Sequence, residues 1–264
     1  MATVLIFGCG WLGSQLGVAL AGAGHQVYGS RRSAQSLLTL PPQIQPLCWD
    51  GQSPFGSSIQ ALLPDSWVIL AMPPAAQRDG GSAYLDSLQR VLGQSSRAKG
   101  LILCSSTGVY AGLAGRVNES AAPGPEPRAA LLWQAEQLVR QHPAPYILRL
   151  AGLVGPGRHP AGFTRRGLMA GPEQPVNLVH SADVCLWVCQ LLTVSGHGFP
   201  QVVNLSAPLT ATKVEFYTAA CIRAEVAVPQ FVAATEPART VDASLSQRDT
   251  GFVYRHHDIS SLCS

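Results

Sequence analysis

The sequence has 264 residues, of which 47% are hydrophobic and 12% are charged, and its formal net charge is +3. This supply of core residues excludes a disordered chain, and the mild, scattered basic charge excludes a surface that tracks nucleic-acid phosphates. No apolar run has the length of a membrane span, and the start lacks a basic segment followed by an apolar segment and a cleavage site. We therefore expect a cytoplasmic protein without a membrane or nucleic-acid partner. The composition is also compatible with a homodimer.

The seven cysteines are an odd number without framework spacing, which indicates free thiols in a reducing compartment. Cys185 and Cys189 lie one helical turn apart and in principle could share a metal. No second pair is near, however, and their segment is apolar, so both are interpreted as core residues. The histidines, including His256 and His257, lack ligand spacing with Cys, Asp or Glu, and no metal site is predicted.

The strongest signal lies in the first thirteen residues. An apolar run at Thr3–Phe7 leads into a G-x-G-x-x-G motif, and apolar side chains then recur at helical spacing over residues 12–23. Gly8 allows a sharp turn, Gly10 removes the Cβ that would block a pyrophosphate, and Gly13 lets the helix lie close to the strand.

The helix that follows the glycines starts at Trp11 and Leu12, and its free N–H groups are expected to face the phosphates of a ligand. The motif alone is a weak signal in a chain with 26 glycines. The order of strand, tight turn and helix favours a dinucleotide site over a plain β-α turn, which is the alternative interpretation.

The identity of the cofactor is predicted from the end of the second strand, expected at residues 26–29. Where NAD-selective proteins usually have an Asp or Glu for the ribose 2′-hydroxyl, this chain has Ser30, Arg31 and Arg32. Two guanidiniums at this point favour a 2′-phosphate, so NADP is predicted ahead of NAD. The alternative is that both arginines are solvated residues that lead into the next helix.

Further cofactor contacts are expected at the ends of two other strands. Asp50 follows the predicted strand 46–49, where it either accepts a hydrogen bond from the adenine amino group or only starts a loop. Met72 and Pro73 end the predicted strand 67–71 at the carboxyl edge of the sheet, which is where ligands bind in such folds.

Strands and helices alternate along the first part of the chain, at 45–49, 57–63, 67–71, 82–96, 100–104, about 128–141 and 145–150. This alternation predicts an α/β fold with a Rossmann-type doubly wound parallel sheet. Residues 1–160 are expected to form the dinucleotide-binding domain, and residues 161–264 a smaller C-terminal substrate lobe. Within that lobe we expect a strand at 176–179, and residues 181–205 are expected to return to the first domain.

A second motif lies in the segment 100–110, GLILCSSTGVY, which places three hydroxyls at the carboxyl end of a strand. Together with GCGWLG, YILRLAGLVGPGR and NLVHSADV, this segment resembles the extended short-chain dehydrogenase/reductase superfamily, also called the NAD-dependent epimerase/dehydratase family. The resemblance covers nearly the whole chain. It implies that Ser106, with Thr107 as a close alternative, helps to hold the reacting oxygen of a substrate.

The chain departs from the family pattern in the helix that should carry a Tyr-x-x-x-Lys pair. The resemblance places Arg128 at the tyrosine position and Leu132 at the lysine position, and a leucine cannot donate to a ribose. This implies an atypical branch that keeps the glycines but lacks the usual proton relay. Tyr110 could act as the acid or be a packed aromatic residue, and Arg128 could bind negative charge or be a surface residue.

His180 and Arg158 are the candidate substrate residues. The resemblance places His180 at the junction of the nucleotide domain and the substrate lobe, although a structural hydrogen bond explains this histidine equally well. Arg158, and also Arg149, could reach a phosphate or carboxylate of a substrate or tie the lobes together.

These observations predict an NADP-dependent oxidoreductase, epimerase or dehydratase that acts on a hydroxylated or sugar-like small molecule. The competing hypothesis is a catalytically silent NADP(H)-binding protein that reports the redox state of its cofactor to a partner. The loss of the Tyr and Lys pair favours this second hypothesis. A structural domain with an empty site is a third alternative, against which the opening motif argues.

Overall fold

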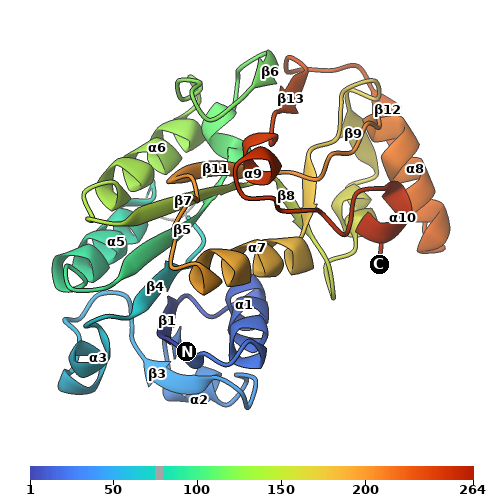
Figure 1. The fold of residues 1–264 in the computed structure, drawn as a ribbon. Helices are drawn as coiled ribbons and strands as arrows, with labels where there is room; N and C mark the ends of the chain where they lie inside the picture. Colours follow the sequence, from blue (N-terminus) through green and yellow to red (C-terminus); the bar gives the residue numbers. More distant parts are fainter. Residues whose placement is uncertain (75–79) are drawn as a thin grey trace. The chain divides into compact units, whose positions relative to one another are not determined.

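The computed structural model describes residues 1–74 and 80–264 (Figure 1). Its centre is a seven-stranded parallel sheet with the strand order β11-β7-β5-β4-β1-β2-β3. The strands are β1 (Thr3–Phe7), β2 (Gln26–Arg31), β3 (Gln45–Cys48), β4 (Trp67–Leu70), β5 (Gly100–Ser106), β7 (Pro145–Leu150) and β11 (Val202–Leu205). The chain runs outward from β1 to β3 and then crosses back to β4 on the other side of β1. The predicted Rossmann-type sheet is confirmed, and its strand order reverses between β1 and β4, where such folds bind ligands.

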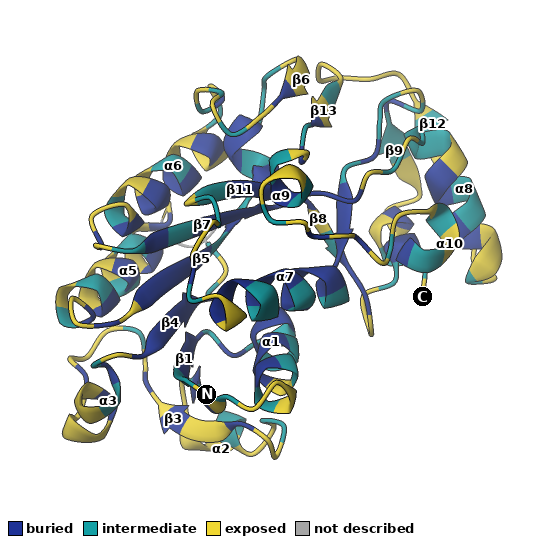
Figure 2. Cartoon of the chain, viewed as in Figure 1, coloured by how far each residue is buried: buried dark blue, intermediate teal, exposed yellow. Residues whose placement is uncertain are grey.

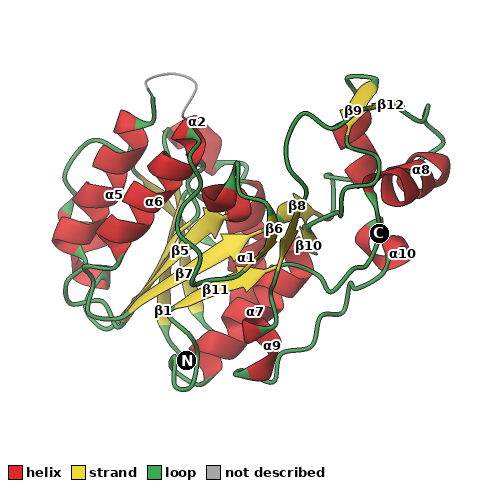
Figure 3. Ribbon diagram, turned by 90° about the horizontal axis from the view of Figure 1, so that it is seen from above, coloured by secondary structure: helices red, strands yellow, loops and turns green. Residues whose placement is uncertain are grey.

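Helices connect the strands on both faces of the sheet. They are α1 (Trp11–Gly22), α2 (Ala34–Leu37), α3 (Ser57–Leu62), α5 (Ser82–Gln94), α6 (Pro127–Val139), α7 (Ser181–Thr193), α8 (Lys213–Arg223), α9 (Leu245–Arg248) and α10 (Ile259–Leu262). Figure 3 shows α5 and α6 on one face of the sheet, and α1 and α7 on the other face. Within residues 1–74 and 80–264, no helix has the length and apolar character needed to cross a membrane.

The central strands of the sheet are buried because helices cover both of its faces, whereas three of the four residues of the edge strand β3 are exposed (Figure 2). All four residues of β4, Trp-Val-Ile-Leu, are buried, as expected of a parallel strand without a polar face. On the α5 and α6 face, the ring of Phe7 stacks on Phe55 at 4.9 Å, and Trp49 meets both rings edge-on. On the opposite face Ile6 packs beneath α1, since a Cβ added to Gly13 would lie 3.3 Å from its side chain.

The chain divides into two compact units. Unit 1 comprises residues 1–106, 130–148 and 185–202, and unit 2 comprises residues 107–129, 149–184 and 203–264. This division differs from the expected boundary at residue 160. Residues 107–129 and 149–160, which follow the carboxyl ends of β5 and β7 in the chain, belong to unit 2. All five tryptophans of the sequence lie in unit 1.

Unit 2 contains short parallel strand pairs that join distant segments of the chain. The pairs are β8 (Gly152–Val154) with β10 (Leu178–His180), β9 (Leu168–Ala170) with β12 (Gln230–Val232), and β6 (Gly115–Val117) with β13 (Arg239–Val241). A separate hydrophobic core lies beside them, in which Phe216 and Tyr217 of α8 pack with Val154 and Leu262. Two 3₁₀ turns, η1 (Thr107–Tyr110) and η2 (Pro160–Thr164), also belong to this unit.

Candidate functional site

The G-x-G-x-x-G motif forms the turn between β1 and α1, and its glycines are required for different reasons. Gly8 has a φ of +88°, and a Cβ added there would lie 2.6 Å from the backbone nitrogen of Met72. A Cβ on Gly13 would lie 2.6 Å from the carbonyl oxygen of Gly8. Gly10 differs, because its φ is −82° and the atom nearest to an added Cβ, among the described residues, would be 3.9 Å away. The fold requires Gly8 and Gly13, whereas Gly10 keeps open a space that none of the described residues fills.

Helix α1 begins directly after this turn, with Trp11 and Leu12 as its first two residues. Its N-cap residue is Gly10, which has no side chain that could accept hydrogen bonds from the first turn, and the first turn carries no acidic residue. The first N–H groups of a helix lack intrahelical partners and form the positive end of its dipole, so they favour phosphate. The residues of this turn fit the pyrophosphate of a dinucleotide.

Ser30 supports the glycine turn from β2. Its side chain is buried, its hydroxyl oxygen accepts a hydrogen bond from the N–H of Gly8 at 3.1 Å, and its carbonyl oxygen accepts one from the N–H of Cys9 at 3.1 Å. These bonds give Ser30 a structural role beneath the turn. Its predicted contact with a cofactor phosphate stays a prediction.

Arg31 ends β2, and Arg32 follows it in an exposed position. The Nε atom of Arg31 is buried and has no hydrogen-bond partner among the described residues. A buried donor without a partner costs about 1–3 kcal/mol, so this atom is suited to an acceptor that the described residues do not supply. The next helix, α2, is capped by Ser33 and Ser36 through their hydroxyls, and its first turn carries no acidic residue. The local charge fits a ligand phosphate.

Asp50 binds its own loop. One carboxylate oxygen accepts hydrogen bonds from the N–H groups of Gln52 and Ser53, both at 2.8 Å, and the other accepts one from the Ser53 hydroxyl at 2.7 Å. These bonds, chiefly the one from the Ser53 backbone, lower the pKa of Asp50 to about 2. The structure favours the interpretation that Asp50 starts a loop, and its contact with adenine stays a prediction.

Met72 and Pro73 follow β4 at the carboxyl edge of the sheet. Because β4 pairs with β1 in parallel, with Leu70 opposite Phe7, the residues after both strands meet at the same edge. The half-buried Met72 packs against Gly8, whereas Pro73 is exposed. The structure thus brings the glycine turn and Met72 together.

The hydroxyl residues at the end of β5 have different surroundings. Ser105 is buried, and its hydroxyl donates to the Glu136 carboxylate of α6 at 2.8 Å. Ser106, the last residue of β5, is half-buried, and Thr107 is buried at the start of η1. Ser105 has a structural partner, and Ser106 and Thr107 remain the candidates for holding a substrate oxygen.

Glu136 was not predicted as a functional residue, although its carboxylate is fully buried. The signal lay in its position, because Glu136 shares the apolar face of its helix with Leu132 and Val139, at spacings of four and three residues. A charged residue on an apolar face indicates a buried partner.

Tyr110 is fully buried, and its hydroxyl is hydrogen-bonded on both sides. The hydroxyl donates to Oδ1 of Asn204 at 2.8 Å and accepts from Nη1 of Arg149 at 2.7 Å. Burial raises the pKa of Tyr110, and the positive charge of the nearby Arg149 guanidinium offsets part of this increase. Arg149 is itself fully buried and also donates to the Glu119 carbonyl at 3.2 Å. This arrangement favours a structural role for Tyr110 over proton donation, and Arg149 ties together segments of unit 2.

The two positions at which the chain departs from the pattern of the family that it resembles have opposite surroundings. Arg128 is exposed in the first turn of α6, so its role with an anionic substrate stays a prediction. Leu132, one turn later, is only 1% exposed and belongs to the interior of unit 1. The position at which the resemblance places a lysine therefore lies in the apolar interior.

His180 ends β10 and anchors a C-terminal segment. Its buried ring stacks on His256, with ring centroids 3.7 Å apart, and its Nδ1 accepts a hydrogen bond from the N–H of Ala182 at 3.2 Å. The buried carboxylate of Asp183 accepts hydrogen bonds from the N–H groups of Arg255 and His256, both at 3.0 Å. Burial, and then His256, lower the pKa of His180. These contacts support the structural interpretation of His180, and its substrate role stays a prediction.

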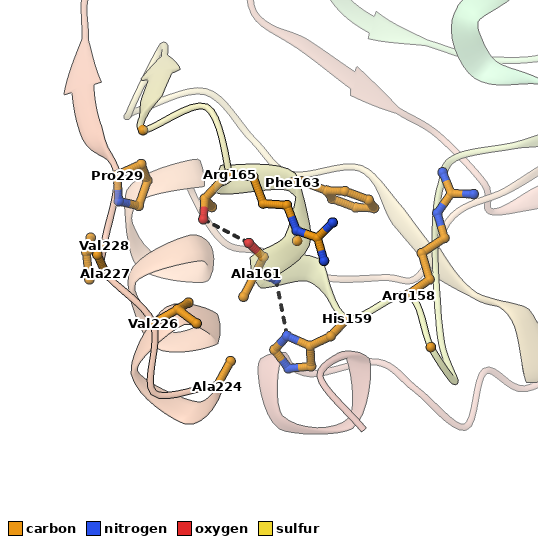
Figure 4. Close-up of a pocket in the computed structure, with 14 residues that line it drawn as sticks. Arg158, His159, Ala161, Phe163, Arg165, Ala224, Val226, Ala227, Val228 and Pro229 are labelled. Carbon is orange, nitrogen blue, oxygen red and sulfur yellow. Dashed lines mark hydrogen bonds between the residues drawn. The ribbon is translucent and has the colours of Figure 1, made fainter.

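Arg158 is exposed and lines a cavity of about 720 Å³ in unit 2 (Figure 4). Its guanidinium lies over the Phe163 ring, 5.7 Å from the centroid. His180 is not among the residues that line this cavity, so the structure does not place the two candidate substrate residues around one cavity.

Cys185 and Cys189 are free thiols on α7, and burial raises the pKa of Cys185 to about 12. Within the described ranges, 1–74 and 80–264, no three His, Cys, Asp or Glu side chains gather in a group that could hold a metal ion.

The sheet order and the glycine turn give the fold that the sequence resemblance implied, and solved epimerase/dehydratase structures share this fold. A protein from Methylobacillus flagellatus, provisionally assigned as an NAD-dependent epimerase/dehydratase, matches with a TM-score of 0.79 and 24% identity over 99% of this chain and 96% of its own. MoeE5, solved with UDP-glucose and NAD, matches with a TM-score of 0.78 and 20% identity over 98% of this chain and 96% of its own.

In sequence, the chain is similar to protein YeeZ of Escherichia coli K12. The two are 29% identical over 277 aligned positions, which cover 98% of this chain and 97% of YeeZ. No family model matches the chain.

Proposed function

We propose that this protein binds NADP(H) and acts as an oxidoreductase, epimerase or dehydratase on a hydroxylated or sugar-like small molecule. The observation that carries the proposal is the open space at Gly10, at the start of a helix whose cap residue has no side chain. A glycine that the fold does not need, placed where phosphates bind in such folds, is explained by a ligand. The UDP-glucose and NAD held by MoeE5 support the sugar-like class of substrate.

The residues of unit 1 fit the parts of the cofactor. Gly10 and the first turn of α1 would hold the pyrophosphate, and Arg31 with Arg32 would hold the 2′-phosphate of NADP. The buried Nε of Arg31, which has no hydrogen-bond partner within residues 1–74 and 80–264, is the observation that favours NADP over NAD. A bound nicotinamide supplies hydride transfer, and Ser106 with Thr107 would orient the oxygen of the substrate.

A second candidate function is that of a catalytically silent NADP(H)-binding regulator. It is favoured by Leu132, which buries an apolar side chain at the position of the family lysine, and by Tyr110, whose hydroxyl is engaged within unit 2. Both candidate functions need the same cofactor site and differ only in turnover.

The cofactor proposal is tested by calorimetric titration of NADPH, NADP⁺, NADH and NAD⁺ into the wild-type protein, Arg31→Ala and Arg140→Ala. We expect NADPH to bind at least about ten-fold more tightly than NADH, because a charge-assisted bond contributes about 1.5–3 kcal/mol. Arg31→Ala should remove most of this preference. The control residue Arg140 is exposed and directly follows α6, so Arg140→Ala should not change the preference. Tighter binding of NADH would overturn the NADP assignment, and no binding of any nucleotide would overturn the proposal itself.

Turnover separates the two candidate functions. Oxidation of NADPH is followed with small carbonyl compounds and reduction of NADP⁺ with sugar nucleotides, and the redox-neutral epimerase and dehydratase reactions are followed by product analysis of the sugar nucleotides, for the wild-type protein and for Ser106→Ala. Turnover that Ser106→Ala lowers by about 10²-fold supports the enzyme, since an orienting hydroxyl acts mainly on the transition state. No turnover, together with different affinities for NADP⁺ and NADPH, supports the regulator.

A further inference from the structure

The cavity in unit 2 has the size of a small-molecule site. Its volume is about 720 Å³, and ligand pockets span roughly 300–1,000 Å³. One wall is the segment 157–167, which contains η2, and the other wall is the segment 224–229, between α8 and β12 (Figure 4). It therefore lies at the amino-terminal ends of β9 and β12, which pair in parallel from Leu168 and Gln230 onward.

The two walls expose large apolar side chains toward the cavity. Phe163 on one wall is 37% exposed, and Val226 and Val228 on the other wall are 48% and 43% exposed. Exposed apolar side chains that gather around a hollow mark binding surfaces, because burial against a ligand removes their contact with water.

The polar groups of the cavity are cationic. Arg158 and Arg165 both line it, and Figure 4 shows both guanidiniums on the η2 side, with Arg165 beside Phe163. His159 is also on this wall, where its Nδ1 caps η2 by accepting a hydrogen bond from the N–H of Ala161 at 3.2 Å. None of the described lining residues is an Asp or Glu, although the exposed Glu225 is next in sequence to two of them.

Arg165 differs from the other basic groups in its lack of a protein partner. No hydrogen bond or ion pair engages its guanidinium within residues 1–74 and 80–264. A guanidinium beside an apolar surface is weakly hydrated and binds carboxylate, sulfonate or phosphate oxygens in a fork-like geometry.

We propose that this cavity binds an organic anion with an apolar body. Its carboxylate, sulfonate or phosphate group contacts Arg165 and Arg158, and its aliphatic or aromatic part packs against the apolar lining of the cavity. This site does not rest on the dinucleotide proposal, because all of its lining residues belong to unit 2 and none belongs to the glycine turn.

The test uses anilinonaphthalene sulfonate, a fluorescent aromatic anion, as the probe. It is titrated into the full-length protein with and without excess NADPH, and decanoate and decyltrimethylammonium are then used as competitors. We expect one saturable site that decanoate occupies and the cation does not, because the cavity offers guanidiniums and no carboxylate. Displacement of the probe by NADPH, or equal competition by the cation, would overturn the proposal.

Matched variants locate the probe. Arg165→Ala is expected to raise its dissociation constant about ten-fold, since the charged hydrogen bond is lost at a partly exposed site. The exposed neighbour Arg166 does not line the cavity, so Arg166→Ala should have no effect. Val226→Ser should weaken binding several-fold, whereas Ile222→Ser, which alters an exposed apolar residue outside the lining, should not.

Equal effects of Arg165→Ala and Arg166→Ala would show that net charge alone attracts the probe, and equal effects of the two serine variants would show a general apolar surface suited to a protein partner. Either result overturns the proposal. Circular dichroism of each variant checks folding, and Arg165→Gln serves as the second variant at this position. Because NADPH binding is measured separately, failure of this site and failure of the dinucleotide site are distinguishable.

Discussion

At the scale of single residues, the glycine turn separates the requirements of folding from those of binding. Gly8 and Gly10 are two residues apart, yet only Gly8 has a positive φ and a backbone neighbour within 3 Å of an added Cβ. Glycine is therefore needed at the two positions of the motif for different physical reasons. The sequence motif predicted both glycines, but only the structure shows which one the fold can spare.

Replacement of each glycine by alanine tests this separation. Gly10→Ala should change the free energy of unfolding by less than about 0.5 kcal/mol and should weaken NADPH binding at least about ten-fold. Gly8→Ala should destabilise the protein by about 1–3 kcal/mol, because alanine is strained at this φ and meets the Met72 backbone. Urea denaturation and calorimetry measure the two quantities. A Gly10→Ala protein that binds NADPH normally would contradict the assignment of this space to the pyrophosphate.

The buried pair of Ser105 and Glu136 supplies a second prediction. Glu136→Ala should lower the free energy of unfolding by about 2–4 kcal/mol, because it leaves a cavity and deprives the Ser105 hydroxyl of its acceptor. Glu136→Gln keeps an oxygen acceptor and should cost less than half as much. The exposed neighbour Gln137 provides the control, since Gln137→Ala should have almost no effect in urea denaturation. Equal losses for the alanine and glutamine variants at position 136 would contradict this role of the hydrogen bond.

The hydrogen-bond partners of Ser30 and Asp50 could not be predicted from the sequence. Ser30 and Asp50 stand at the strand ends where ligand contacts were expected, and the structure shows the partners that each has within the protein. Side-chain hydrogen bonds of this kind depend on the conformation of turns that the residue pattern does not specify. The residue pattern predicted the strand ends at which both residues lie. Only the structure shows that Ser30 is buried beneath the glycine turn, whereas Asp50 is exposed and binds its own loop.

At the scale of elements, the long apolar strands were predictable and the short pairs of unit 2 were not. The predicted run Thr3–Phe7 matches β1, and the predicted strand 145–150 matches β7, because buried parallel strands are continuous apolar segments. The strand expected at 176–179 is β10, Leu178–His180. The pair β9 and β12 has only three residues in each strand, and the strands lie some sixty residues apart in the chain, so local patterning cannot identify their pairing.

The C-terminal segment is held to the start of α7 by a cluster that responds to pH. Burial, and then His256, lower the pKa of His180 below its ordinary value of 6.5 in the folded protein, with Asp183 acting in the opposite direction. Between the folded and unfolded pKa values the unfolded chain binds more protons, so stability falls as the pH decreases below about 6.5. Above that pH the stabilisation is fully present.

His180→Gln should therefore flatten the decrease in the free energy of unfolding between neutral and mildly acidic pH. Urea denaturation at a series of pH values measures this change. The exposed His197 is the matched control, and His197→Gln should leave the wild-type slope unchanged. The comparison must be with the wild-type profile, since burial also lowers the pKa of His25. Identical slopes for wild type and His180→Gln would contradict the prediction.

At the scale of the whole molecule, the chain passes repeatedly between its two compact units. Three segments of the sequence form each unit, and α6, α7, β7 and β11 each contain residues of both. Neither unit is a continuous stretch that could be cut from the chain, so a single boundary, such as the one expected at residue 160, does not separate them. Continuous helices and strands that belong to both units should make their unfolding cooperative.

The distribution of tryptophan makes this cooperativity measurable. Tryptophan fluorescence reports unit 1 alone, because all five tryptophans lie there, whereas far-ultraviolet circular dichroism reports the helices of both units. We expect the urea midpoints of the two signals to coincide. NADPH at a hundred times its dissociation constant should raise the free energy of unfolding by about 2.7 kcal/mol and so move both midpoints together. Separate midpoints would show that the units unfold independently.

The burial of Leu132 has a consequence for how this protein could change over evolutionary time. A lysine at this position, as in the family that the chain resembles, would place an ammonium group where the side chain is now 1% exposed, and an unpaired charge there costs several kcal/mol. A single Leu132→Lys substitution would therefore destabilise the fold before it could supply any chemistry. A proton relay in this protein would have to arise from residues other than the one at position 132.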